Sequence, residues 1–278
     1  MAFNSTIYWN DITFNAVLLP QHNANVLPLN DPEFSISTPI VPKDEQILEL
    51  NNPYEYGISI NIPFNSMDIT TSYFSGYDRI LSFFGANVWS NQAFTDPIIA
   101  DTIFSYRKTD VYGLGYSLLT GDFTMRGDFG YFNTFDQINK KEDLYREYDE
   151  GKQLIIEACE EKNVELPPWG KPVDCKSDPT YKETFSMDNN AKYYQFNFEM
   201  EYSLNIDFNI ILQYSKHESI KFGKSDSLTL STGTILLNPE ELFIPGMGSP
   251  NTFISSNSLS ITAQKSFSDK GLEFRYIS

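Results

Sequence analysis

Residues 194–214 read YQFNFEMEYSLNIDFNIILQY, and every second position in this stretch carries a large apolar or aromatic side chain. The series breaks at Leu204-Asn205 and then resumes, with Ile211 as its one exception, and polar side chains fill most positions between. A helix, with its period of 3.6 residues, would scatter these side chains around its circumference, whereas a strand sorts them onto two faces. The stretch therefore predicts two antiparallel strands joined by a tight turn, each with one apolar and one polar face.

The same alternation recurs along the rest of the chain. It is present in seven further segments, which cover residues 12–18, 56–62, 67–73, 112–118, 123–131, 259–263 and 272–276. A strand that crosses a hydrocarbon core at a tilt needs about 9–11 residues, and many of these segments can be extended to that length. The sequence predicts about nine strands in total.

The connections between these strands alternate between short and long. Four are tight turns, at residues 63–66, 120–122, 204–205 and 268–271. Four are long, at residues 20–53, 81–102, 136–191 and 220–253. An outer-membrane barrel has this layout, with short turns on one side of the membrane and long loops on the other. A soluble sandwich has no reason to place every long loop at one end.

Composition agrees with a barrel and excludes some other classes. Mean hydropathy is −0.34 and no window approaches the roughly 18 apolar residues of a spanning helix. In a barrel, each strand has an apolar and a polar face, and their opposite hydropathies cancel in such an average. Aromatic residues make up 15% of the chain, with 22 Phe and 17 Tyr, and Tyr suits sites that are apolar at one end and wet at the other. The net charge of −17 argues against a nucleic-acid-binding surface.

We therefore expect an all-β fold: an antiparallel up-and-down transmembrane β-barrel that forms one domain over residues 1–278. Nine strands is an odd number, and an open set would leave two unpaired edges in lipid. Either strands are missed in 81–102 or 220–253, with Ser227 to Leu237 as a candidate, or the chain is a fragment of a larger barrel. The lack of an export signal at the start and the abrupt final strand, ending GLEFRYIS, favour the fragment.

The longest connection, residues 136–191, is predicted to be an external loop insertion with some helix. Residues 141–163 (KEDLYREYDEGKQLIIEACEEKN) place apolar side chains at helical spacing among many charges. They predict one or two short helices, broken near Gly151, over or in the barrel mouth; the alternative is a solvated acidic loop with partial helix. Cys159 and Cys175 lie in the same insertion, and in an oxidising compartment they are a disulfide candidate, the alternative being two free thiols.

Residues 110–134, DVYGLGYSLLTGDFTMRGDFGYFNT, resemble the strand–turn–strand that recurs in largely uncharacterised, porin-like outer-membrane proteins of Gram-negative bacteria. The matching positions are Gly121, Asp122, Phe123, Arg126, Gly127, Asp128, Tyr131 and Phe132. Residues 14–28, FNAVLLPQHNANVLP, are similar to a strand that runs into an external loop. The resemblance implies location in the outer membrane and passage of small solutes. The chain departs from the family in lacking an export signal and the terminal aromatic residue that closes the last strand.

The polar face of the predicted strands supplies the candidate pore-lining residues: Arg126, Asp128, Asn197, Glu199, Glu201, Asp207, Asn209, Gln213, Glu273 and Arg275. Their charges either set the field that selects a passing solute or pair across strands as a structural ladder. The excess of acids predicts preference for cations in an open pore. Residues 243–250 (FIPGMGSP) are predicted to fold inward as a constriction or, alternatively, to pack as an external loop.

No motif of a known catalytic or metal site is present, and the only histidines, His22 and His217, are far apart in sequence. We expect no enzyme activity, no cofactor and no metal. The favoured reading is a passive pore or uptake channel of the bacterial outer membrane, whose partners are the lipid bilayer and small solutes, with the oligomeric state left open. The alternatives are a non-transport surface protein (an adhesin or assembly component) and a soluble secreted β-sandwich that binds carbohydrate.

Overall fold

The fold is described from a computed structural model of the chain. The residues that the structure describes are 2–24, 46–48, 50, 53–91, 98–136, 153, 156–157, 159–161, 163–165, 167–170, 180–187, 190–205, 208–222, 226–230, 233–237, 240, 243–248, 256–267 and 272–277.

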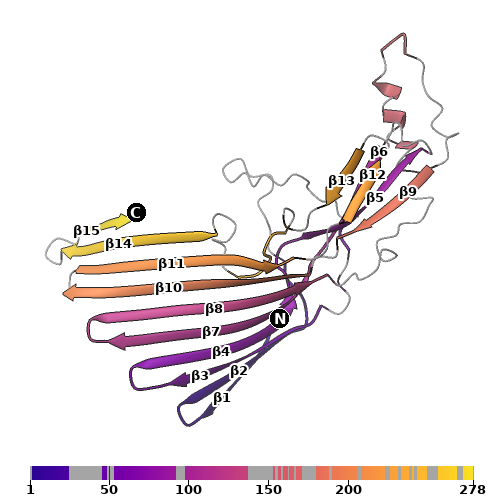
Figure 1. Cartoon of the computed structure of the whole chain (residues 1–278). Coiled ribbons are helices and arrows are strands. Elements are labelled where there is room, and N and C mark those ends of the chain that lie inside the picture. The colour runs from indigo at the N-terminus through magenta and orange to yellow at the C-terminus, as the bar shows by residue number, and fades with distance from the viewer. Residues whose placement is uncertain are drawn as a thin grey trace.

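The main element is a ten-stranded sheet in which every neighbouring pair is antiparallel (Figure 1). In spatial order its strands are β1 (Phe3–Trp9), β2 (Ile12–Leu19), β3 (Glu55–Pro63), β4 (Met67–Tyr77), β7 (Lys108–Thr120), β8 (Phe123–Phe135), β10 (Ala191–Asn205), β11 (Phe208–Lys221), β14 (Asn257–Phe267) and β15 (Leu272–Ile277). Strand order follows chain order, so the sheet is an up-and-down meander. The all-β, antiparallel prediction is confirmed.

The ten strands of the main sheet include the nine predicted ones and β1, which was missed. Five more strands lie outside this sheet, so the predicted total of about nine is too low for the fifteen strands that the described residues form. Phe3, Ile7 and Trp9 lie on one side of β1, but Ser5 interrupts the apolar series, so the alternation is weak at the level of sequence. The turn that follows is tight: Asn10 has a φ of 51°, the left-handed conformation that two-residue hairpin turns use. An even number of strands results, so the two edge strands, β1 and β15, run in opposite directions.

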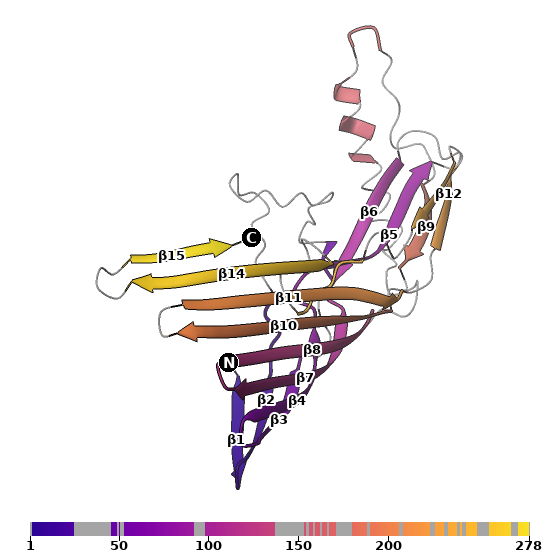
Figure 2. The same ribbon diagram turned by 60° about the vertical axis from the view of Figure 1, so that its left-hand side comes forward.

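The five hairpin turns gather at one end of the sheet and the long connections leave from the other, as Figure 1 shows. The predicted alternation of short and long connections is therefore reproduced in space. Figure 2 shows that the sheet is curved and twisted, with its edges apart. β1 pairs with β2 alone and β15 with β14 alone, so the described strands form an open sheet and the predicted closed barrel is not found.

The long connections build a second, smaller body, here called the cap. β5 (Ser82–Asn91), β6 (Ile98–Ser105) and β9 (Thr180–Ser186) form a three-stranded sheet in the order β6-β5-β9, and β12 (Asp226–Leu230) and β13 (Gly233–Leu237) form a hairpin. The candidate strand within 227–237 thus exists, but it and the strands of 82–105 lie outside the main sheet.

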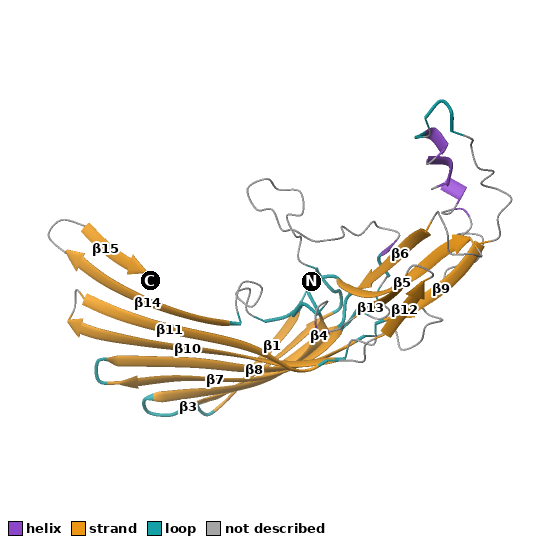
Figure 3. Ribbon diagram, turned by 45° about the horizontal axis from the view of Figure 1, so that its top comes forward, coloured by secondary structure: helices purple, strands orange, loops and turns teal. Residues whose placement is uncertain are grey.

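The first long connection also joins the cap, because Ile47 bridges to Phe104 on β6. Phe84 and Ile103 form the buried centre, with Leu48 packed against them. The described residues between 153 and 164 are helical, in agreement with the predicted short helix. They lie at the far end of the cap from the main sheet (Figure 3), and the open sheet has no closed mouth for them to cover.

Candidate functional site: the two faces of the sheet and a buried charge cluster

The register places the predicted pore-lining side chains on one face of the sheet, here called the polar face. Residues directly opposite in an antiparallel ladder share a face. Arg126 lies opposite Glu199, which lies opposite Gln213, and Asp128 lies opposite Asn197 in the neighbouring row. Glu201 and Asn209 follow on the same face. Glu273 and Arg275 occupy positions of this face by register, since they pair with Ser266 and Gln264. Asp207 lies outside the described residues.

Arg126 and Glu199 form an ion pair across the β8–β10 ladder. Arg126 Nη1 donates to Glu199 Oε1 at 3.1 Å, and Gln213 Nε2 donates to Glu199 Oε2 at 2.8 Å. The two charged side chains are 57% and 30% exposed, so the pair stabilises the sheet by no more than about 1 kcal/mol. This group matches the predicted cross-strand ladder. It also neutralises Arg126, which leaves the carboxylates of this face in excess.

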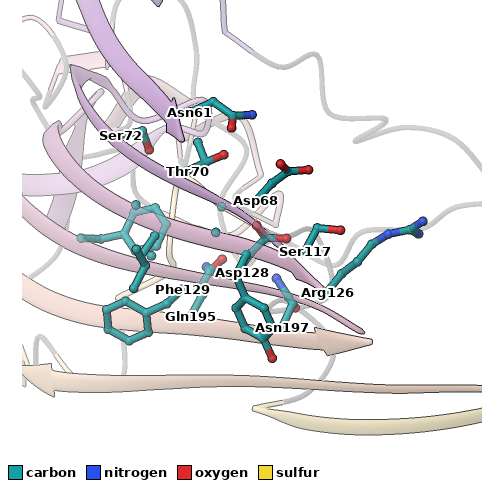
Figure 4. Close-up of a pocket in the computed structure, with 17 residues that line it drawn as sticks. Asn61, Asp68, Thr70, Ser72, Ser117, Arg126, Asp128, Phe129, Gln195 and Asn197 are labelled. Atoms are coloured by element: carbon teal, nitrogen blue, oxygen red, sulfur yellow. The ribbon is translucent and has the colours of Figure 1, made fainter. Parts of the chain in front are cut away.

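A hollow of about 630 Å³ lies on the polar face beside this ladder (Figure 4). Its polar lining side chains are Asn61, Asp68, Thr70, Ser72, Ser117, Arg126, Asp128, Gln195 and Asn197. Glycines form part of its floor: a Cβ at Gly115 would lie 2.9 Å from Asp128 Oδ1, and one at Gly113 would overlap Ser72 Oγ. The small floor residues are what allow the polar side chains of β4 and β8 to lie over β7.

The polar face changes character toward the long connections. There Phe132 and Tyr193 stack with ring centroids 4.5 Å apart and an interplanar angle of 3°. Both are buried, and the next positions on this face, Glu55, Thr109 and Thr134, are buried as well. The hollow is therefore bounded at this end by an aromatic layer followed by a polar one.

Glu55, at the start of β3, is the centre of the first buried charge group. Arg79 donates to both of its carboxylate oxygens, at 2.9 and 2.7 Å, and the Tyr77 backbone N–H donates at 3.1 Å. His22 Nδ1 lies 2.9 Å from Glu55 Oε1. Glu55 has no exposed side-chain surface, and a buried carboxylate needs such partners. Glu55 approaches His22 from a strand 33 residues away in sequence, a contact that no sequence pattern indicates.

Asp78, Arg107 and Asp136 form the second buried group, just beyond the ends of β4, β7 and β8. Thr109 Oγ1 donates to Asp78 Oδ1, and Arg107 Nε lies 3.3 Å from Asp136 Oδ1. Complete burial raises the pKa of Asp78 from its ordinary value of 3.8 to about 6, although Arg107 and the Thr109 hydrogen bond act in the opposite direction. Within the described residues, the Arg107 guanidinium forms no hydrogen bond. We call these three side chains, together with Glu55, Arg79 and His22, the buried charge cluster.

Residues 243–248, here called the inward segment, pack on this cluster. The Arg79 backbone N–H donates to the Gly246 carbonyl at 2.9 Å, and Tyr193 Oη donates to the Met247 carbonyl at 3.2 Å. Gly248 reaches the hollow itself. The described part of FIPGMGSP thus packs against buried side chains of the main sheet and reaches the hollow, while Ser249 and Pro250 lie outside the described residues.

The opposite face of the sheet, here called the apolar face, is exposed although it is rich in large hydrophobic side chains. Leu114 is 52% exposed and Ile58 56%. Toward the long connections this face ends in a tyrosine row, Tyr73, Tyr112, Tyr131 and Tyr194, which lie opposite one another on four successive strands. The next row out is polar, with Ser75, Asp110, Asn133 and Lys192. At the turn end Phe123 and Tyr202 stack at 4.3 Å.

The remaining predicted features are placed as follows. Cys159 is buried and disulfide-bonded, and Cys175 lies outside the described residues. His217 lies in β11 with its ring 5.4 Å from Tyr193. Among the side chains that the structure describes, no group of three or more His, Cys, Asp or Glu residues is arranged to hold a metal ion. The described helical residues include no segment long and apolar enough to cross a membrane.

The buried charge cluster was not predicted from the sequence. Its members come from separate connections, and Glu55 and Arg79 are separated by 24 residues, so no local pattern identifies them. A comparison with known proteins adds no assignment: no family model, no curated protein and no solved structure matches the chain.

Proposed function

We propose that this chain forms the wall of a channel for small solutes in a bacterial outer membrane. The observation that carries the proposal is the pair of opposite faces. The apolar face exposes large hydrophobic side chains that water disfavours, and the polar face carries charged and amide side chains around a hollow. Lipid against the apolar face and an aqueous solute path along the polar face would suit the side chains of each.

The dimensions of the apolar face support a bilayer. Tyr194 in the tyrosine row and Tyr202 at the turn end are eight residues apart on β10, which is roughly 26 Å along the strand, or about 20 Å at a tilt of about 40°. The apolar band of outer-membrane barrels is about 25 Å tall and is bordered by aromatic residues. The change from Tyr to Ser, Asp, Asn and Lys beyond the tyrosine row is what a membrane–water boundary requires.

Membrane insertion requires the open edges to be paired. Unpaired backbone groups of β1 and β15 would each cost several kcal/mol in hydrocarbon. The two edge strands run in opposite directions, so they can pair antiparallel with each other or with further strands that complete the wall. The proposal therefore concerns the protein with both edge strands of its main sheet paired.

The test is detergent extraction followed by conductance. The protein should fractionate with outer membranes, migrate differently on gels before and after heating, and produce ion currents in planar bilayers. A compact monomer that purifies without detergent would overturn the membrane assignment. A heat-modifiable protein that carries no current would leave the membrane assignment and overturn the channel.

A second function class, a surface protein without transport, is favoured by one observation. The long connections assemble into a cap instead of separate loops, and the polar face is buried at the end from which they leave. Such a cap is suited to contact with an external partner. Absence of current together with surface exposure of the cap would favour this class. The sandwich alternative loses support, because the described cap strands extend from one end of the main sheet and do not lie over its face (Figures 1 and 2).

A further inference from the structure

The inward segment (residues 243–248) sits in a seat made by three other parts of the chain. The Met247 carbonyl accepts hydrogen bonds from Tyr193 Oη at 3.2 Å and from Gln195 Nε2 at 3.3 Å. The Gly246 carbonyl accepts from the Arg79 backbone N–H at 2.9 Å. Two consecutive carbonyls are thus held by β10 and by the connection after β4.

Glycine is required at two positions of this seat. A Cβ at Gly246 would overlap the Asp78 carboxylate, and one at Gly248, whose φ is +104°, would overlap the Gln195 amide. At the start of the segment, the Phe243 ring lies 5.0 Å from the Arg107 guanidinium carbon and 5.6 Å from the Tyr193 ring. The fit is close on both sides of the segment.

The seat lies at the outer end of the hollow. Gly248 and Gln195 line the hollow, while Tyr193, Asp78 and Arg107, just beyond, are fully buried. A solute that moves along the polar face of β4, β7, β8 and β10 would meet a packed barrier at this point.

Resting on the proposed channel function, we propose that the inward segment is a gate that closes the outer end of the hollow and opens by leaving its seat. The segment is suited to move because none of its own side chains forms an ion pair. It is held by hydrogen bonds to two of its carbonyls and by the contacts of the Phe243 ring. Ile244 is 48% exposed and makes no part of the seat.

The closed arrangement carries a cost that opening would relieve. Asp78 Oδ2 and the three guanidinium nitrogens of Arg107 are buried without a hydrogen-bond partner among the described residues. Arg107 keeps its ion pair with Asp136, but a buried polar atom without a hydrogen bond disfavours the state that contains it. Water that enters when the gate leaves would satisfy these atoms, so the two states can lie close in free energy.

Proton binding at Asp78 would shift the equilibrium between the closed and open states of the gate. The groups that face it are Arg107 and Thr109, Arg79 on its own connection, His22 after β2, Tyr193 on β10 and Gly246 of the gate. With the gate closed, its pKa is about 6; with water admitted, it would return toward 3.8. Because the closed state raises the pKa, protonation favours closure. Lowering the pH from 7 to 5 should increase the closed-to-open ratio about tenfold.

The test is single-channel recording of the full-length protein at pH 7 and pH 5. The wild type should show the tenfold change, and the Asp78→Asn variant, neutral at both pH values, should remain mostly closed without a pH response. The His22→Gln variant removes the only imidazole among these neighbours and should keep the response. An Asp78→Asn variant that responds like the wild type would overturn proton control, and a Gly246→Ala variant with unchanged open probability would overturn the gate. Ile244→Ala, outside the seat, is the matched control and should behave like the wild type.

A second readout does not require conductance. In detergent, the Met247→Cys variant should react with a water-soluble maleimide more slowly at pH 5 than at pH 7, relative to Phe64→Cys in an exposed turn, with labelling read by peptide mass. Gate movement without current would mean that the channel proposal has failed and the gate has not. Equal relative rates at both pH values, in a protein that conducts, would overturn the gate and leave the channel.

Discussion

Tyr112 lies directly opposite Tyr131 across the β7–β8 ladder, with ring centroids 6.3 Å apart on the apolar face. The same register continues to Tyr73 on one side and Tyr194 on the other. A tyrosine side chain is most stable where its ring lies in apolar surroundings and its hydroxyl group is in contact with water. This row therefore gives a depth marker, and positions on the apolar face can be ranked by their distance from it.

Leu212 is the position we choose to test the lipid-facing assignment. It pairs with Met200, between the tyrosine row and Tyr202, whereas Ile210 shares a row with Tyr202. Arginine on the lipid-facing side costs about 2–4 kcal/mol at the bilayer midplane and about 0–1 kcal/mol near its interfaces. Leu212, one row in from Tyr202, lies between these depths, so Leu212→Arg should reduce folding into membranes. Gln213→Arg, one residue along and on the polar face beside Glu199, should be tolerated. Folding yield into lipid vesicles measures both, and equal yields would mean that the faces are assigned wrongly.

Arg126 and Glu199 should have opposite effects on ion selectivity. Arg126→Gln removes a cation from the polar face and leaves Glu199 unneutralised, so preference for cations should increase; Glu199→Gln should decrease it. Stability should change by less than about 1 kcal/mol in either variant because the pair is exposed. Reversal potentials in a salt gradient measure the effect. A shift in the same direction for both variants would contradict a path along this face.

Glu55→Gln should be strongly destabilising. The substitution removes the charge that Arg79 and His22 contact, and the Arg79 side chain is only 26% exposed. Loss of one partner of a largely buried pair costs about 2–4 kcal/mol. Glu201→Gln on the polar face is the matched control and should change the free energy of unfolding by less than about 0.5 kcal/mol. Urea titration in detergent distinguishes the two; a similar midpoint for both would show that the buried charge cluster contributes little.

Reduction of the Cys159 disulfide should affect the cap and not the main sheet. Cys159 is disulfide-bonded, and a disulfide typically stabilises the folded state by about 2–4 kcal/mol. Hydrogen exchange of the helical residues near Cys159 should accelerate after reduction, while amides of β7 and β8 should keep their protection. Faster exchange in β7 or β8 would mean that the cap and the sheet unfold together.

The main sheet could be predicted from the sequence because the patterns that define its strands and turns lie within short segments of the chain. Nine of its ten strands show period-2 alternation, and the tight turns fix their pairing. β1 was missed for a local reason too, since Ser5 interrupts its apolar side. The cap was missed because β5 holds Phe83 and Phe84 in succession, with Phe84 fully buried, so no alternating pattern marks the strand.

The candidate site divides in the same way. Arg126, Asp128 and Asn197 were placed together by strand period alone. Asp78 and Arg107 are ordinary loop charges at the level of sequence, and only the return of four connections to one end of the sheet buries them. Closure of the sheet was expected because unpaired backbone groups at its edges are unfavourable in lipid. That penalty comes from the surrounding bilayer, and the chain by itself does not include the bilayer.

The cap has a consequence for the order of assembly. In the main sheet, Pro63 pairs with Asp68 only a few residues away, so each hairpin closes a small loop. In the cap, Gly85 pairs with Ser186, about a hundred residues later. Contacts between distant residues form late because their loop-closure entropy must be overcome first. β5 and β6 therefore remain an incomplete sheet until β9 is available, and the β5–β9 pairing closes the longest loop among the described strand pairs.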